Sequence, residues 1–182
     1  KPNLGQVEIN GSTNNNAVKL SDEMTQCAAV IIDEDETDPA KRYKMVYMVL
    51  ANTWVFRTAT SGDGITWDVP DNHPTEKFLE MGSFFKFGDQ FVVHGQGIGK
   101  NDNGTPEGRQ GYASFSTDFV NWDQKYKEAF RLPEPEDKTK RGLSGDYPQV
   151  HIGVGATSFG NVAVGLYGVW HNPPVEKRRK KG

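Results

Sequence analysis

A short motif that occurs twice constrains the fold of this chain most strongly. Residues 61–67 and 116–122 both fit the pattern S-x-D-x-[I/V]-x-W, and the two copies begin 55 residues apart. Ser and Asp side chains bond nearby backbone N–H groups in tight turns, and we expect the Ile or Val and the Trp to pack back between adjacent sheets. Four short strands with their loops fit into a repeat of this length, which favours the blade of a β-propeller.

The rest of the chain predicts an all-β fold. Short segments rich in β-branched and aromatic residues end at Gly, Asp, Asn or Pro, which is typical of strands. The expected strands are 27–33, 43–50, 54–60, 82–87, 90–95, 111–116, 148–154 and 162–170.

The connections between these strands are also predictable. Residues 87–90 and 159–161 predict tight hairpin turns. Residues 123–130 carry a weak signal for one or two helical turns. Residues 99–109 and 132–142 predict long polar loops, which often border functional sites. The acidic run 33–36 is interpreted as a solvated outer hairpin.

The repeat predicts blade-like units at about 17–70, 71–125 and 143–182, the last one incomplete, within a single propeller domain that includes all of residues 1–182. These are about three blades, fewer than a closed five-bladed ring needs. We therefore expect a second chain or a missing segment to complete the ring. An open β-sandwich is the structural alternative, which the 55-residue register disfavours.

Composition excludes several classes of protein. The lone Cys27 excludes an intrachain disulfide framework. The net charge is −3, and because residues 177–181 carry five positive charges, the remainder stands at −8. An acidic body argues against nucleic-acid binding. No apolar run approaches the roughly 18 residues of a membrane span, so we expect no membrane partner.

Several segments resemble a known superfamily. Residues 38–47 followed by 60–67, and residues 147–153 with 165–171, are similar to blades of the five-bladed β-propeller glycoside hydrolases. These are the furanosidase-type families 32, 43, 62, 68 and 117 with their uncharacterised bacterial relatives, and residues 1–5 with 14–16 look like the connector before such blades. The resemblance implies a secreted or periplasmic bacterial protein that acts on a plant or algal polysaccharide. It also implies three carboxylates on the innermost strands, the first of them in a blade that this chain lacks.

Two acids stand where such carboxylates are expected. Glu80 and Asp146 each come directly before a predicted inner strand, and cleavage of a glycosidic bond needs two carboxyl groups across that bond. Apolar neighbours of Glu80 would suit a general acid. The alternatives are a surface Glu80 at a loop end and an Asp146 that caps a turn.

Five further residues are candidates for contacts with the substrate. Trp170 and His171 end the last predicted strand, and an exposed indole stacks on sugar rings. His151 suits a hydrogen bond to a sugar hydroxyl or to a carboxylate. Gln96 and Arg109 flank a polar loop that would close over a ligand. Blade packing is the alternative for Trp170, and a structural role is the alternative for the histidines.

These features favour a glycoside hydrolase that acts on a poly- or oligosaccharide by carboxylate acid–base catalysis in a propeller funnel. The alternatives are a non-catalytic carbohydrate-binding propeller and a sugar-active propeller with another reaction type, such as a phosphorylase or transferase. No cofactor is implied, apart from a structural calcium ion that a propeller axis can hold.

Overall fold

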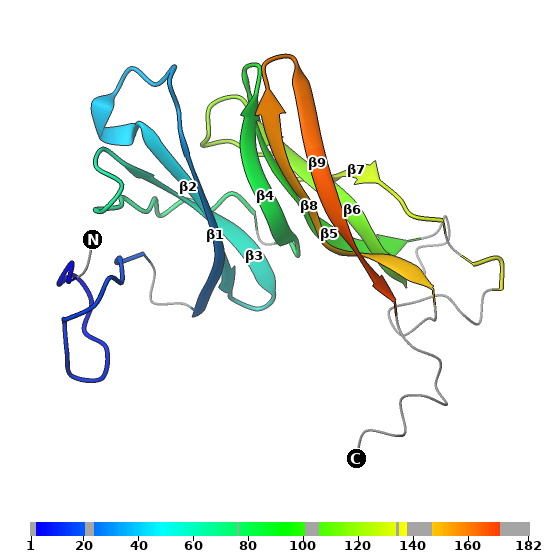
Figure 1. Cartoon of the computed structure of the whole chain (residues 1–182), viewed down its shortest axis with the longest axis horizontal. Coiled ribbons are helices and arrows are strands. Elements are labelled where there is room, and N and C mark those ends of the chain that lie inside the picture. The colour runs from blue at the N-terminus through cyan, green and yellow to red at the C-terminus, as the bar shows by residue number, and fades with distance from the viewer. Residues whose placement is uncertain are drawn as a thin grey trace. The chain divides into compact units, whose positions relative to one another are not determined.

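The computed structural model describes residues 3–20, 24–75, 77–100, 106–133, 135–137 and 147–171. Within these ranges the regular structure consists of antiparallel strands and one short 3-10 turn, so the all-β prediction is confirmed. The chain divides into two compact units, residues 1–76 and 77–182, and each is described by itself (Figure 1).

The first unit is a three-stranded sheet in the order β1 (Met24–Ile32), β2 (Tyr43–Leu50) and β3 (Trp54–Ser61). The central strand β2 is covered on both faces because its residues from Lys44 to Val49 are all buried. Tyr47 lies at the centre of an apolar cluster to which β2 and β3 contribute and against which Trp67 packs. An uninterrupted apolar run of this kind is typical of a strand buried on both faces.

The acidic run differs from the expectation of a solvated hairpin. Asp33 is only 5% exposed, and the Nζ atom of the buried Lys44 lies 2.7 Å from Glu36 Oε2 and 3.7 Å from Asp33 Oδ2. The hydrogen bond from Lys44 is the main cause that lowers the pKa of Glu36. The run also contains the ion-pair partners of a buried lysine, which charge patterning alone did not indicate.

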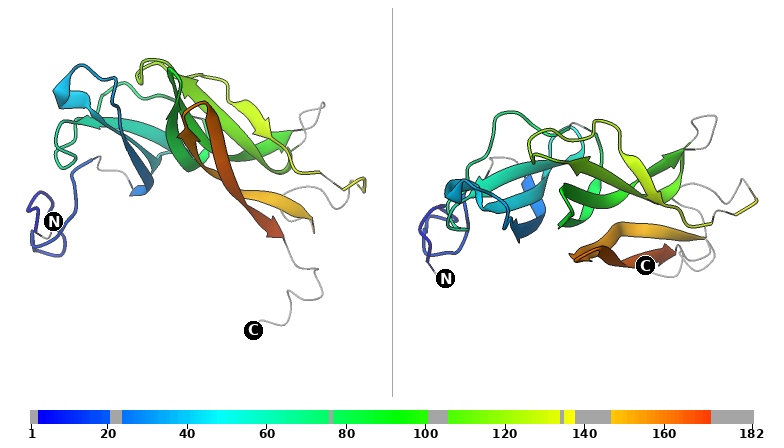
Figure 2. Two further views of the ribbon diagram at one scale, coloured as in Figure 1. Left: turned by 45° about the horizontal axis from the view of Figure 1, so that its top comes forward. Right: turned by 90° about the horizontal axis from the view of Figure 1, so that it is seen from above.

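The second unit consists of two layers. A four-stranded sheet has the order β4 (Glu80–Phe87), β5 (Gln90–Lys100), β6 (Pro106–Ser116) and β7 (Lys127–Phe130). The hairpin of β8 (Pro148–Phe159) and β9 (Val162–His171) lies as a second layer against β4, β5 and β6 (Figure 2). Phe85, Val92 and Ala156 pack between the two layers.

The connections confirm some predictions and correct others. Both predicted hairpin turns form, with Gly88 at φ +60° and Gly160 at φ +61°, a conformation that glycine adopts at low cost. The helical expectation for 123–130 is wrong, because Lys127–Phe130 pairs with β6 as strand β7. The polar loop expected at 99–109 is shorter, because β5 extends to Lys100 and β6 begins at Pro106.

The two copies of the sequence motif form the same turn. Ser61 Oγ accepts hydrogen bonds from the backbone N–H groups of Asp63 and Gly64. Asp63 Oδ1 accepts from the backbone N–H groups of Ile65 and Thr66 at 2.8 and 2.7 Å. Ser116 and Asp118 repeat this network at nearly the same distances. Bonds from the backbone of Thr66 and Ile65 lower the pKa of Asp63 to about 2. The predicted role of the motif as a turn is confirmed.

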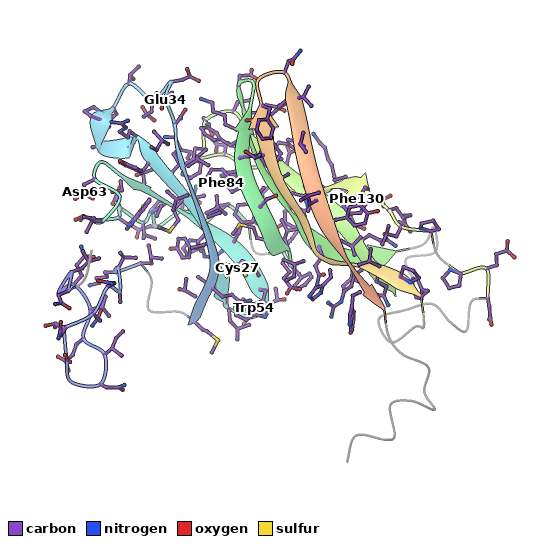
Figure 3. All side chains as sticks on the ribbon, in the orientation of Figure 1. Cys27, Glu34, Trp54, Asp63, Phe84 and Phe130 are labelled. Atoms are coloured by element: carbon purple, nitrogen blue, oxygen red, sulfur yellow. The ribbon has the colours of Figure 1, made fainter. Side chains whose placement is uncertain are left out.

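In the second copy of the motif, one apolar position is buried and the other is exposed. Trp122 is buried and its ring meets that of Phe119 edge-on, with centroids 5.9 Å apart. Val120, however, is 62% exposed, so the expectation that it packs inward is wrong. Phe119 adopts φ +66° and turns its ring inward in place of Val120, towards the aromatic group that contains Phe84 (Figure 3).

The first strand of each sheet carries a β-bulge. The register shifts between Gln26 and Ala29 in β1, between Met81 and Ser83 in β4, and between His151 and Val154 in β8. A bulge bends a strand and changes the direction of the side chains next to it. This structural repeat extends to the third sheet, where the described residues contain no copy of the sequence motif.

Candidate functional site

The candidate site lies where β8 crosses the four-stranded sheet of the second unit. Three glycines bring the two backbones close together at this crossing. A Cβ atom on Gly82 would lie 2.5 Å from the carbonyl oxygen of Ile152, and one on Gly153 would lie 2.7 Å from the carbonyl carbon of Gly95. Any larger residue at Gly82 or Gly153 would push the layers apart.

Three side chains of β4 and β5 hold the bulge of β8 in place. Ser83 Oγ donates to the carbonyl oxygen of Val154 at 2.6 Å, and the N–H of the same residue donates to His94 Nδ1 at 3.0 Å. The N–H of Ile152 donates to Gln96 Oε1 at 2.6 Å. The bulge frees these backbone groups from the β8–β9 ladder, and the neighbouring sheet satisfies them.

His94 is a neutral, buried member of this contact. The side chain is 7% exposed and stacks on Phe130, with ring centroids 5.7 Å apart and an interplanar angle of 14°. Phe130 in turn contacts Tyr167 of β9 (Figure 3). Burial lowers the pKa of His94 to about 4, because a charged ring would lose its hydration. His94 therefore positions β8.

Gln96 links this contact to the one candidate acid that the structure describes. Gln96 is 2% exposed, and its Nε2 donates to Glu80 Oε2 across the β4–β5 pair. Glu80 is half-buried as the first residue of β4. A single buried amide therefore orients the Glu80 carboxylate and also binds the backbone of β8.

Arg109, His151 and Trp170 form a second group, which we call the RHW cluster. The guanidinium carbon of Arg109 lies 4.1 Å from the centroid of the Trp170 ring, and its Nη1 lies 3.4 Å from His151 Nδ1. The rings of His151 and Trp170 have centroids 6.3 Å apart. Because Arg109 can only donate, the contact leaves the proton of a neutral His151 ring on Nε2, where it can donate to a ligand.

A buried glutamine fixes the backbone beneath the RHW cluster. Gln149, fully buried in β8, accepts a hydrogen bond on Oε1 from the N–H of Arg109 at 3.1 Å. Gln149 also pairs with Trp170 in the β8–β9 ladder. Strand β8, which carries His151, therefore binds the backbone of Arg109 and pairs with Trp170, the two residues that contact that histidine.

Among the residues selected from the sequence, the structure brings Arg109, His151 and Trp170 into contact, and it joins Glu80 to Gln96. Glu80 begins β4 opposite Gln96, and Trp170 pairs near the start of β8. Asp146 lies outside the described residues. The backbone of His171 ends β9 opposite Pro148, and its side chain also lies outside the described part.

Sequence reasoning missed Gln149. A glutamine in a strand is more often exposed than buried. No local pattern distinguishes a buried Gln149 from a surface one, because its partner Arg109 is 40 residues away in the sequence. A buried glutamine becomes recognisable only when the strands that face it are known.

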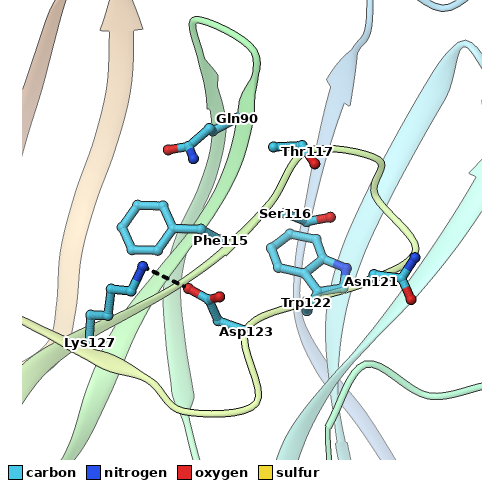
Figure 4. A pocket seen from close by; sticks show the side chains of 8 residues that line it. All are labelled: Gln90, Phe115, Ser116, Thr117, Asn121, Trp122, Asp123 and Lys127. Atoms are coloured by element: carbon cyan, nitrogen blue, oxygen red, sulfur yellow. Dashed lines mark ion pairs between the residues drawn. The ribbon is translucent and has the colours of Figure 1, made fainter.

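A shallow pocket of about 300 Å³ lies beside the second turn motif, between Trp122, Phe115 and Lys127 (Figure 4). Lys127 Nζ pairs with Asp123 Oδ2 at 3.2 Å there. The lining of this pocket includes residues of the turn and contains none of the candidates named above. Within the described ranges, no three His, Cys, Asp or Glu side chains come together as a metal-binding group.

Comparisons with known proteins give no relative. No protein-family model, no curated protein and no solved structure matches the chain. Among the described residues, no helix has the length and apolar character that a membrane span requires.

Proposed function

We propose that this chain forms part of a β-propeller that hydrolyses a glycosidic bond in a poly- or oligosaccharide, and that the RHW cluster contacts the sugar. The observation that carries the proposal is the meeting of Arg109, His151 and Trp170 beside a strand pair that bears Glu80. An indole next to polar donors suits a sugar, whose C–H face is apolar and whose rim carries hydroxyls.

In this mechanism Glu80 and Asp146 are the two carboxyl groups that flank the scissile bond. One of them protonates the leaving oxygen, and the other acts as nucleophile or as base for a water molecule, through an oxocarbenium-like transition state. Gln96 is a positioning residue for Glu80, since its amide donates to the carboxylate. His151 donates from Nε2 to a sugar hydroxyl, and Trp170 provides the stacking surface.

A non-catalytic carbohydrate-binding propeller is the second candidate. Glu80 is the one catalytic candidate within the described residues, and its Oε2 already accepts from Gln96. The RHW cluster itself contains no acid and binds a sugar equally well without chemistry. This function needs only the binding residues, of which the structure describes the side chains of Arg109, His151 and Trp170.

The test measures release of an aryl alcohol from a panel of aryl glycosides, with binding of the parent oligosaccharides measured in parallel. We expect turnover by the wild type and a loss of at least about 100-fold in Glu80→Gln. Glu128→Gln is the matched control. Glu128 lies on β7 and pairs with Arg131, so this substitution should leave turnover unchanged.

Equal turnover in wild type and Glu80→Gln would remove Glu80 from the mechanism. Binding of an oligosaccharide without turnover of any substrate would favour the non-catalytic function. Absence of both binding and turnover would overturn both candidates.

A further inference from the structure

Some cations of the described residues form ion pairs, whereas others, Arg109 and Arg42 among them, lie over aromatic rings. Lys41, Lys44, Lys127 and Arg131 each pair with a carboxylate. Arg109 forms no ion pair within the described part. Its guanidinium instead meets the Trp170 ring and His151 Nδ1. The RHW cluster therefore carries a positive charge with no counter-ion from the described residues.

The stacking on Trp170 fixes the orientation in which Arg109 presents its donors. A guanidinium that lies over an indole uses its planar face, whereas its N–H groups point outwards in the plane. One of these N–H groups is directed at His151. The others remain for a ligand, in a fork that matches the two oxygens of a carboxylate or of a sulfate ester.

We propose that the RHW cluster recognises the anionic group of an acidic saccharide, either a uronate carboxylate or a sulfate ester. This inference rests on the proposed function and names its substrate class. Arg109 binds the anion bidentately, and His151 donates from Nε2 beside it.

The same geometry disfavours a neutral sugar. A ligand that covers Arg109 removes water from its charge, and such a loss is costly unless an opposite charge replaces the water. An uncharged hydroxymethyl group cannot do so, whereas a carboxylate at the same position can. Selectivity thus arises from a penalty on the neutral ligand as well as from attraction of the acidic one.

Glu80 does not supply the missing counter-ion. Its carboxylate is hydrogen-bonded to Gln96, and Arg109 lies on β6, which is separated from β4 by β5. Two strand spacings amount to about 10 Å. A ligand that reaches both Arg109 and Glu80 is therefore longer than one sugar, with its acidic residue at the Arg109 end.

The test compares matched pairs of oligosaccharides by titration calorimetry. Each pair has the same length and stereochemistry, in the gluco, galacto and manno series, and differs only in a C6 hydroxymethyl or a C6 carboxylate. A third arm carries a sulfate ester on the neutral oligosaccharide. We expect at least one acidic arm to bind at least about tenfold more tightly than its neutral partner, and the arm that does so identifies the anion.

Two variants assign the preference to Arg109. Arg109→Gln should abolish the preference for the acidic ligand while it changes neutral binding little, and Arg109→Lys should restore part of it because a lysine keeps the charge without the fork. Arg131→Gln, which removes an arginine that pairs with Glu128, should keep the full preference. Circular dichroism confirms that each variant is folded.

Each outcome decides between the two proposals. Neutral and acidic partners that bind equally, or an unchanged preference in folded Arg109→Gln, would overturn this inference and leave the proposed function standing. If no member of any pair binds, the proposed function and this inference both fail.

Discussion

Acidification is expected to destabilise the second unit through His94. The folded ring has a pKa of about 4, whereas a histidine in an unfolded chain titrates near 6.5. Between these values the unfolded chain takes up a proton that the folded chain cannot, so stability is complete above pH 6.5 and is lost as the pH falls towards 4. From the difference between the two pKa values, the free energy of unfolding falls by about 2 kcal/mol between pH 8 and pH 5.

The geometry of the contact explains why the folded ring resists its proton. Nδ1 of His94 accepts from the N–H of Val154 at 3.0 Å, so a proton on Nδ1 would break this bond between β5 and β8. The neutral ring already carries its proton on Nε2, so the imidazolium forms by protonation of Nδ1, which also places a charge beside Phe130 in a site that is 7% exposed. Formation of the imidazolium therefore weakens the contact that holds the bulge of β8.

The assay is urea unfolding of the whole chain, followed by tryptophan fluorescence at pH 8, 6.5 and 5. His94→Gln retains an acceptor for the N–H of Val154 and does not titrate. Its free energy of unfolding should therefore fall by about 2 kcal/mol less than that of the wild type over this range. His73→Gln, which alters an exposed loop residue of the first unit, should follow the wild type. Parallel pH curves for wild type and His94→Gln would refute the reasoning.

Three substitutions test the remaining structural arguments by the same unfolding measurement. Gln96→Leu leaves a backbone N–H of β8 without its acceptor and should lower the free energy of unfolding by about 1–3 kcal/mol. The control Gln90→Leu alters an exposed residue and should change the free energy of unfolding by less than about 0.5 kcal/mol. Equal stability of the two variants would contradict the role of Gln96. Gly82→Ala forces a Cβ atom to 2.5 Å from a backbone oxygen and should lower the free energy of unfolding by about 1–3 kcal/mol. Gly155→Ala is its control, because a Cβ atom there makes only an ordinary contact at 3.7 Å. Asp118→Ala removes the acceptor of two turn N–H groups and should cost about 1 kcal/mol; an unchanged midpoint would show that the turn forms without this side chain.

The candidate site was predictable in its members but not in its contacts. Glu80 and Trp170 were selected because they stand at the ends of predicted strands, and strand ends can be located from local composition. The stacking of Arg109 on Trp170 joins residues of two sheets. A pairing of this kind depends on how the β8–β9 hairpin lies on the four-stranded sheet, which no local pattern encodes.

The sequence by itself determined the strands and the turn motif, because both depend on interactions within a few residues. The hydrogen bonds of Ser61 and Asp63 reach no further than three positions along the chain, and short segments bounded by turn residues located every strand of the described residues except β7. The tertiary structure alone decided which polar side chains are buried. Gln96 and Gln149 are covered because β8 approaches the sheet at Gly82, where the absence of a side chain lets two backbones meet.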